Sequence, residues 1–561
     1  MYLRTTTSRP RKDGTVVRYL QLAHNEWDPA SGQSKVRVLY NFGREDRVDR
    51  EAITRLISSL QRVLDPGQAR GATVPAELSF VDSRAAGGAW ALHHLWRRLG
   101  IDQTLRGLLA TRRREPLTER MIFALVANRA LEPSSKLAAT RWVAERVALP
   151  GLAEVSDDAC YRAMDFLLEV EEELAEQVYF SVADLLNLEV DLLFFDTTST
   201  YFEIEAPDAP GEGETIGFRT YGHSKDHRPD LPQVVIGMAV TRGGIPVRCW
   251  CWPGNTGDQA LIRQVKEDLR AWKLSRVVWV ADRGFSSAEN RRYLQRAGGH
   301  YIIGEKLRGE SKEAAAALSR QGRYHTVAGN LRVKEVVIDD GVMRDRFVVC
   351  HNPEQAARDE FVRDQLVAQL EGAVTGSDKL AATARAELAG KLGAHPGLRR
   401  FLRTTPGGLL RVDRAAVAAE RRLDGKFLLR TSDPTLSAED VALGYKQLLE
   451  VERGWRDMKS TLELRPVYHH LERRIRAHVL LCFLALLLIR VAETAGKDTW
   501  RNLRHELDRM HLGTFTGPAG RMCQRTETTP GQRAIFRALG IAEPPRFVRL
   551  EPAGAAEAAS A

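Results

Sequence analysis

The stretch DLLFFDTTSTYFE at residues 191–203 places one carboxylate, Asp196, directly after four apolar residues. The stretch VVWVADRG at residues 277–284 repeats this arrangement with Asp282. Short apolar runs bounded by polar residues are typical of buried β-strands. We therefore expect both aspartates at strand ends, on the rim of one sheet. The alternative is that each aspartate only ends its strand and caps a loop.

The segments that follow predict a sheet of mixed direction covered by helices. PQVVIGMAVTR and IPVRCWCW are joined by a Gly-Gly turn, which indicates a hairpin. Helical and strand patterns then alternate as far as HYIIGEK, so the order from residue 190 is β-β-β-α-β-α-β. Antiparallel strands followed by alternating helices and strands indicate an α/β fold with a mixed sheet. Upstream, the periodicity of residues 89–188 predicts four or five helices.

A third carboxylate, Glu452, lies in a segment that predicts one long helix beginning at Ser437. Steps of three and four residues place five side chains on one face of that helix: Tyr445, Leu448, Glu452, Trp455 and Lys459. A carboxylate is seldom buried without a partner, so a glutamate in the middle of such a face indicates a functional group. The alternative is a surface pair of Glu452 with Lys459, but seven residues exceed an ordinary i,i+4 spacing.

Two aspartates and a glutamate together offer oxygen ligands for hard cations such as Mg²⁺ or Mn²⁺. Two such ions about 4 Å apart can activate a water or a 3′-hydroxyl and stabilise the leaving oxygen at a phosphodiester. The three acids therefore predict metal-dependent phosphoryl transfer.

Three blocks of the sequence resemble the catalytic blocks of DDE transposases from bacterial insertion sequences: DLLFFDTTSTYFE, VVWVADRGFSSAEN and YKQLLEVERGWRDMKSTLELRPVYHH. The third block resembles the Tyr-x2-Arg-x3-Glu-x6-Lys signature of a large superfamily of these enzymes, with Leu448 in place of the arginine. GHSKDHRPDLPQ, GNTGDQ and residues 465–488 also resemble a subgroup of this superfamily. The resemblance spans about residues 190–490 and implies a ribonuclease-H-like fold with an insertion before the catalytic helix.

The resemblance implies that Asp196, Asp282 and Glu452 are the catalytic residues and hold two Mg²⁺ or Mn²⁺ ions in each active site. It also implies a phosphate contact for Lys459, for which the alternative is a solvated surface lysine. For Arg283 and Arg456 the alternative is a salt bridge. The residues that we expect to contact DNA are Tyr445, Lys459, Arg456, Arg283, Lys225 and Arg228.

The composition permits a nucleic-acid partner without establishing one. The 82 Lys and Arg residues exceed the 73 Asp and Glu residues, which gives a net charge of +9. Residues 1–70 alone hold 13 basic and 8 acidic residues. Such an excess suits contacts with the phosphate backbone.

Cysteine and histidine patterns do not indicate a zinc site. The six cysteines are scattered without a C-x-x-C pair, which favours a reducing compartment over a disulfide framework. His223 and His227 share H-x3-H spacing, but no cysteine or distant histidine pair completes a site, so HSKDHRPD is expected to be a polar loop near the active site. The longest apolar run, residues 479–489, is shorter than the roughly 20 residues of a membrane span. We expect a cytoplasmic, nucleoid-associated protein with no membrane partner.

Changes of periodicity divide the chain into six expected parts. These are a small basic DNA-binding region of β-hairpin and helix (1–75), a helical DNA-binding or dimerisation region (76–188), the first part of the ribonuclease-H-like core (189–305), an inserted subdomain of mixed α/β character (306–425), the part of the core with the catalytic helix (426–495), and a C-terminal region with a tail (496–561).

The sequence thus predicts a DDE transposase that binds the terminal inverted repeats of an insertion sequence. It would act on double-stranded DNA, cleave it and join the 3′-ends to target DNA, as a homodimer in the DNA complex. One alternative is a ribonuclease-H-like nuclease without strand transfer. Another is a DNA-binding derivative that has lost catalysis, against which the three intact acids argue.

Overall fold

The computed structural model describes residues 1–7, 16–28, 32–64, 78–186, 192–211, 216–270, 272, 277–308, 311–339, 344–518 and 520–552. The chain divides into two compact units. The first comprises Met1–Arg98, Arg114–Cys160 and Val491–Ala561, and the second comprises Leu99–Arg113 and Tyr161–Arg490. The expected C-terminal tail, from residue 553 on, lies outside the described residues.

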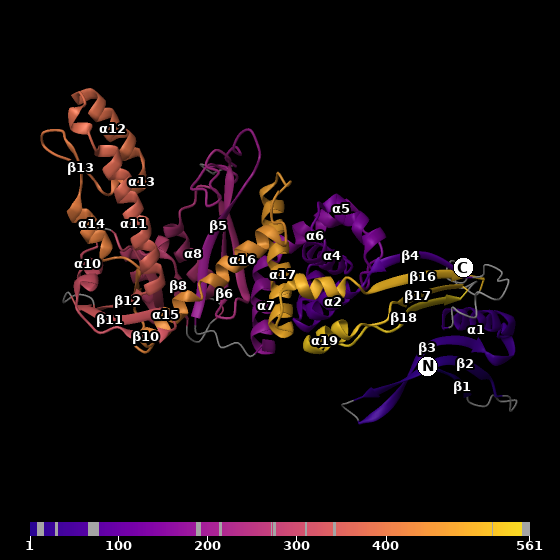
Figure 1. Ribbon diagram of the computed structural model, residues 1–561. Coiled ribbons are helices and arrows are strands. Elements are labelled where there is room, and N and C mark those ends of the chain that lie inside the picture. The colour runs from indigo at the N-terminus through magenta and orange to yellow at the C-terminus, as the bar shows by residue number, and fades with distance from the viewer. Residues whose placement is uncertain are drawn as a thin grey trace. The chain divides into compact units, whose positions relative to one another are not determined.

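The second unit contains a nine-stranded sheet in the order β10-β11-β12-β15-β9-β8-β5-β6-β7. Its strands are β5 Leu192–Tyr201, β6 Gln233–Thr241, β7 Pro246–Pro253, β8 Val278–Ala281, β9 His300–Glu305, β10 His325–Ala328, β11 Leu331–Asp339, β12 Arg344–His351 and β15 Lys426–Thr431. Figure 1 labels β5, β6, β8, β10, β11 and β12 among these strands. β5 pairs antiparallel with β6 and parallel with β8, and β8 pairs parallel with β9. With helices α8 Asp258–Arg270 and α9 Ala288–Gln295 in their places, the predicted β-β-β-α-β-α-β order and the mixed α/β fold class are confirmed.

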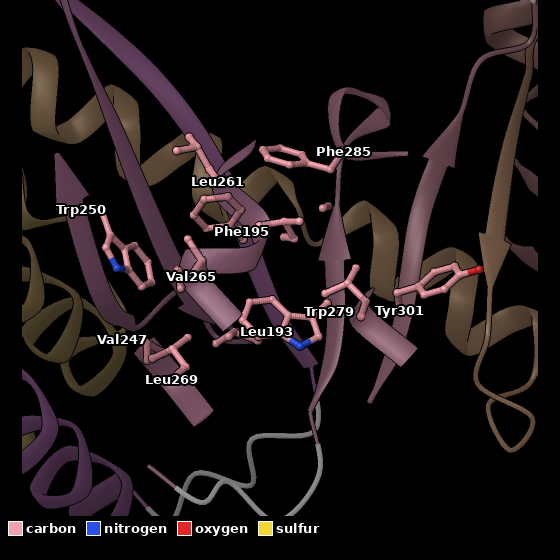
Figure 2. Packing of buried hydrophobic residues seen from close by; sticks show 14 of the residues in the cluster. Leu193, Phe195, Val247, Trp250, Leu261, Val265, Leu269, Trp279, Phe285 and Tyr301 are labelled. Atoms are coloured by element: carbon pink, nitrogen blue, oxygen red, sulfur yellow. The ribbon is translucent and has the colours of Figure 1, made fainter. Parts of the chain in front are cut away.

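The two faces of β5 carry different neighbours. Leu193 and Phe195 join a buried cluster that includes Trp250 of β7, Leu261 of α8 and Trp279 of β8 (Figure 2). Successive side chains of a strand point to opposite faces of the sheet. The side chains at even-numbered positions of β5 therefore lie on the face that is packed against two further helices, α15 Ala438–Lys446 and α16 Leu449–Ser460.

The predicted long helix from Ser437 is divided into these two helices, so the prediction of one continuous face is wrong. α15 begins with a capping box of Ser437 and Asp440. At the junction the amides of Gln447 and Leu448 bond three residues back, each at 3.0 Å, instead of four. Tyr445 therefore belongs to α15, whereas Glu452, Trp455 and Lys459 belong to α16.

The catalytic-block helix α16 is held on both sides. Its residue Gly454 packs against the sheet, where an added Cβ would lie 2.6 Å from Met238 of β6. On the side of the next helix, α17 Glu472–Gly496, the guanidinium of Arg490 lies 2.6 Å from Asp457. Among the described residues α17 is the one helix long and apolar enough to cross a membrane, but 94% of its apolar window is buried, as in a core helix.

The segment between β9 and β15 contributes both to the sheet and to a separate lobe. β15 pairs antiparallel with β9 and with β12, so the inserted strands continue the central sheet. Helix α10 Lys312–Ser319 packs on these strands. The lobe has its own apolar core and consists of α11 Pro353–Val374, α12 Ala382–Ala394, α13 Pro396–Arg399, β13 Leu402–Thr404, β14 Leu410–Val412 and α14 Arg414–Arg421.

Helices dominate residues 87–186, as the periodicity predicts. They number six rather than four or five, partly because the last long pattern is divided at Val170. They are α2 Gly87–Arg98, α3 Ile101–Thr111, α4 Thr118–Leu131, α5 Lys136–Arg141, α6 Asp157–Glu169 and α7 Glu171–Leu186.

The first unit holds two smaller antiparallel sheets. The predicted hairpin of β2 Arg18–Asp28 and β3 Gln33–Arg44 is observed, with β1 Tyr2–Thr7 as a third strand and helix α1 Arg50–Leu64 after it. A four-stranded sheet pairs β4 Ser79–Ala85 with strands from the other end of the chain. These elements are β16 His511–Gly517, β17 Gly520–Arg525 and β18 Phe547–Pro552, next to helices α18 Trp500–Leu507 and α19 Pro530–Ala538.

Candidate active site

Asp196 and Asp282 lie side by side at the rim of the sheet. Phe195 of β5 pairs with Ala281 of β8 in a parallel ladder, and each aspartate is the next residue along its strand direction. Side-chain alternation turns both carboxylates away from the buried cluster that holds Phe195 and Ala281. They therefore share the face that α15 and α16 cover.

Asp196 lies in a mostly buried and strongly charged environment. Its side chain is 21% exposed, and the ammonium of Lys225 lies 3.8 Å from its Oδ1 atom. Burial raises the pKa of Asp196 to about 6; Lys225 opposes the shift, and the neighbouring Asp258 and Asp282 add to it. A carboxylate in this position stays ionised at neutral pH, but its charge is not fully compensated by the protein.

Asp258 is a residue of this site that the sequence patterns did not single out. It is the first residue of α8, where a helix N-terminus favours negative charge. Thr197 donates a hydrogen bond of 2.6 Å to its Oδ1 atom, and Lys225 lies 3.4 Å from its Oδ2 atom. The signal was present in the block GNTGDQ, in which Asp258 is the one acid.

Two glycines allow the loops of this site to approach each other. The amide of Gly254, in the block GNTGDQ, donates to the carbonyl of Phe218 at 3.1 Å. An added Cβ on Gly254 would overlap the backbone carbonyls of Gln233 and Thr220, and one on Gly222 would overlap the carbonyl of Gly254. The loops that carry Lys225 and Asp258 therefore depend on glycine at both positions.

Glu452 is placed differently from the two aspartates. It lies in the first turn of α16 and is exposed, while Val451 and Trp455 of the same helix are buried. Within the described residues, no group of three or more His, Cys, Asp or Glu side chains lies close enough to hold a metal ion. The structure thus assembles the aspartate pair and leaves Glu452 outside a closed ligand set.

The aspartate pair fits a hard divalent cation. Both groups offer oxygen ligands, which Mg²⁺ and Mn²⁺ prefer. Burial raises the pKa of Asp196 in spite of the ammonium of Lys225 at 3.8 Å, and a cation at this rim would favour the ionised form. Asp196 and Asp282 are therefore the residues best placed to hold it.

The HSKDHRPD loop is tied to the strand and to the catalytic-block helix. The ammonium of Lys459 donates to Thr198 Oγ1 at 2.7 Å and to Asp226 Oδ1 at 2.8 Å. Arg465 lies 2.8 Å from the other oxygen of Asp226, whose side chain is 9% exposed. The side chain of Lys459 is 17% exposed, and burial lowers its pKa against the opposing effect of Asp226. Lys459 is thus not the solvated lysine of the alternative interpretation.

The other residues that we expect to contact DNA differ in their exposure and in their partners within the protein. Tyr445 donates a hydrogen bond of 2.8 Å to Asp282 Oδ1, and burial together with this carboxylate raises its pKa well above the usual range. Lys225 contacts the acids described above, and Arg228 lies 2.8 Å from Asp230. Arg283 and Arg456 are exposed beside Asp282 and on α16, respectively.

Two segments of the chain match families of known proteins. The transposase DDE domain family matches residues 202–488, a segment that contains Asp282 and Glu452 and begins after Asp196. The N-terminal domain of IS1634 family transposases matches residues 3–70. No curated protein matches the chain. A cryo-electron microscopy structure of the piggyBac transposase synaptic complex with hairpin DNA is similar, with 10% identity, a TM-score of 0.34, and coverage of 81% of this chain and 79% of that one.

The DDE match covers more than half of the 561 residues, and DDE domains of transposases use divalent metal ions. The second match places an insertion-sequence transposase domain at the N-terminus, ahead of the DDE segment. The chain therefore belongs to the DDE transposases of bacterial insertion sequences and is a DNA transposase.

Proposed function

We propose that this transposase binds the terminal inverted repeats of its own insertion sequence, cleaves the DNA there and joins the freed 3′-ends to target DNA. The observation that carries the proposal is the pair of Asp196 and Asp282 on adjacent parallel strands, in a chain of the DDE family. Double-stranded DNA is the proposed partner, and a homodimer is proposed because two element ends must be joined together. The proposed setting is the bacterial nucleoid in the cytoplasm.

Asp196 and Asp282 are proposed to hold divalent cations, Mg²⁺ or Mn²⁺ and two in number, with Glu452 as the third ligand. Such ions, when bound, activate a water or a 3′-hydroxyl and stabilise the leaving oxygen of a phosphodiester. The chain supplies the rigid carboxylates on β5 and at the end of β8. Lys225 lies close to Asp196 and Asp258 and partly neutralises the acids before DNA is present.

The proposed DNA contacts differ in whether they must break an ion pair within the protein before they can bind a phosphate. Arg283 and Arg456 are exposed, so a phosphate can reach them directly. Lys459, Lys225 and Arg228 have carboxylate partners in the DNA-free chain, and a phosphate must compete with those carboxylates. We propose the exposed arginines as the first contacts.

A strand-transfer assay tests the proposed function. The purified chain is mixed with a duplex that ends in the element's terminal repeat, a target plasmid, and Mg²⁺ or Mn²⁺. Covalent joining of the repeat's 3′-end to the plasmid is expected, together with its loss when the repeat is scrambled. Cleavage without joined products would instead identify a nuclease, and binding without cleavage a catalytically inactive derivative.

Lys459→Ala is expected to weaken binding to the cleaved end and to lower the slope of log affinity against log salt by about one. It is also expected to lower thermal stability, because the mostly buried Asp226 would lose the ammonium of Lys459 at 2.8 Å and keep the guanidinium of Arg465. Affinity measured at several salt concentrations checks the first effect, and thermal melting checks the second. The double variant with Asp226→Asn should recover part of the stability but none of the salt slope. An unchanged slope for Lys459→Ala would refute the phosphate contact.

A further inference from the structure

The hydroxyl of Tyr445 is bound to a catalytic carboxylate in the DNA-free chain. α15, which ends one residue after Tyr445, packs against β8, β9 and β15. From there the phenol reaches Asp282 at the end of β8 and donates a hydrogen bond of 2.8 Å to Oδ1. This contact links the helix to the sheet rim at the proposed metal site.

A glycine in the sheet leaves room for the phenol. An added Cβ on Gly304 of β9 would overlap the hydroxyl of Tyr445 and would lie 3.1 Å from its Cζ atom. The ring of Phe427, on the neighbouring strand β15, lies nearly parallel to the phenol, with 6.2 Å between centroids and 27° between planes. The position of the hydroxyl is thus specified by β9 and β15 as well as by α15.

We propose that Tyr445 is a positioning residue for Asp282, holding one carboxylate oxygen so that the other is free to face the cation. The inference rests on the proposed function, because it assigns Asp282 to the metal. Hydrogen bonds to a ligating carboxylate fix its orientation, and loss of such partners typically costs about 10–100-fold in metal affinity or activity.

The chemistry of the phenol separates this role from the phosphate contact that the sequence predicts. A tyrosine hydroxyl has one hydrogen to donate. Tyr445 gives that hydrogen to Asp282, so a phosphate oxygen can accept it only if the bond to Asp282 breaks. The two roles therefore compete, and each has its own measurable consequence.

Tyr445→Phe removes the hydroxyl and keeps the ring. Tyr293→Phe is the matched control, because Tyr293 of α9 donates its hydroxyl to Glu267 of α8 on the exposed surface. Gly304→Ala is a second test, since its methyl group displaces the hydroxyl of Tyr445 without changing the tyrosine. Circular dichroism and thermal melting of all three variants show whether they fold as the wild type does.

Two titrations decide the question. Electron paramagnetic resonance of Mn²⁺ with the full-length, DNA-free chain should show affinity about tenfold weaker in Tyr445→Phe and in Gly304→Ala than in Tyr293→Phe. Binding of the terminal repeat in EDTA should stay within about twofold of wild type in all three. If Tyr445→Phe binds Mn²⁺ with the same affinity as Tyr293→Phe, the positioning role is refuted. If Tyr445→Phe in addition binds the repeat more weakly in EDTA, the phenol is assigned to a DNA contact instead.

The same titration separates this inference from the proposed function. A wild-type chain that binds Mn²⁺ but joins no DNA ends would refute strand transfer, while the comparison of Tyr445→Phe with Tyr293→Phe would still test the positioning role. A wild-type chain that binds no Mn²⁺ would overturn both.

Discussion

Asp282→Asn is expected to slow cleavage of the element's end by at least about a thousand-fold, on the order of 4 kcal/mol in activation free energy. The amide replaces one of two adjacent carboxylates at the sheet rim, and neutral oxygen binds a hard cation far less well than a charged one. Affinity for the terminal repeat should change by no more than a few-fold, because Asp282 carries no positive charge to offer a phosphate. Single-turnover cleavage and gel-shift binding of the same duplex measure the two quantities.

Asp196→Asn and Glu452→Gln should have the same effect on cleavage, and removal of divalent cations should match all three. Asp378→Asn is the control, because Asp378 is an exposed aspartate paired with Arg411, and neither residue is proposed to contact DNA. Normal cleavage by Glu452→Gln alone would show that the third ligand is another residue, and Asp258, next to Asp196, would then be the first to examine. Normal cleavage by either of the other two variants would refute the metal site itself.

The strands that carry the two aspartates were predictable because their sequence signal is local. LLFF before Asp196 and VVWVA before Asp282 are buried strands in the structure, and parallel pairing brings their ends together. The family match, residues 202–488, contains the second of these blocks and begins after Asp196. The role of each acid in catalysis remains a prediction that the experiments above address.

Features that depend on distant packing were not predictable from local patterns. Gly444 lies in the last turn of α15, but the segment after it, Tyr-Lys-Gln-Leu-Leu-Glu, contains no Gly or Pro and favours a continuous helix. α15 packs over β9 and β15, while α16 packs over β5 and β6. The break lets each helix pack on its own pair of strands. The pairing of β15 with β9 likewise joins segments separated by the whole insertion.

The polar contacts of the site also depend on the packing of distant segments, so local sequence patterns do not predict them. The sequence predicts Lys225 as a DNA contact from its polar loop and Lys459 from the resemblance to DDE transposases, whereas the structure gives each of them carboxylate partners. A lysine in the sequence is equally compatible with a phosphate and with a carboxylate partner, since both partners are anions. The partner can be identified only when the loop that carries Lys225 and Asp226 is placed beside β5 and α16.

The raised pKa of Asp196 predicts that replacing it with asparagine raises the stability of the folded chain at neutral pH. Its folded-state pKa of about 6 lies above the ordinary value of 3.8. Below pH 3.8 the group is protonated in both the folded and unfolded chain, and it costs no stability. As the pH rises from about 4 to 6 the unfolded chain releases the proton first, so stability falls, and above pH 6 the loss reaches about 3 kcal/mol at 1.36 kcal/mol per pH unit.

Asp196→Asn lacks this titration, so in the absence of divalent cations it should melt higher than the wild type at pH 7.5 but not at pH 4. The expected difference at pH 7.5 is about 4 °C, because an unfolding entropy of about 2.1 cal/mol/K per residue gives a shift of about 1.4 °C per kcal/mol for the roughly 345 residues of the second unit. Asp230→Asn should behave oppositely, because Arg228 lowers the pKa of Asp230 and its ionised form stabilises the fold. Mg²⁺ should raise the melting temperature of the wild type and leave Asp196→Asn unchanged, since a cation that binds the folded state stabilises it by mass action. Equal melting curves for wild type and Asp196→Asn at every pH would show that the charge of Asp196 is already compensated within the protein, which would remove the electrostatic reason for placing a cation there.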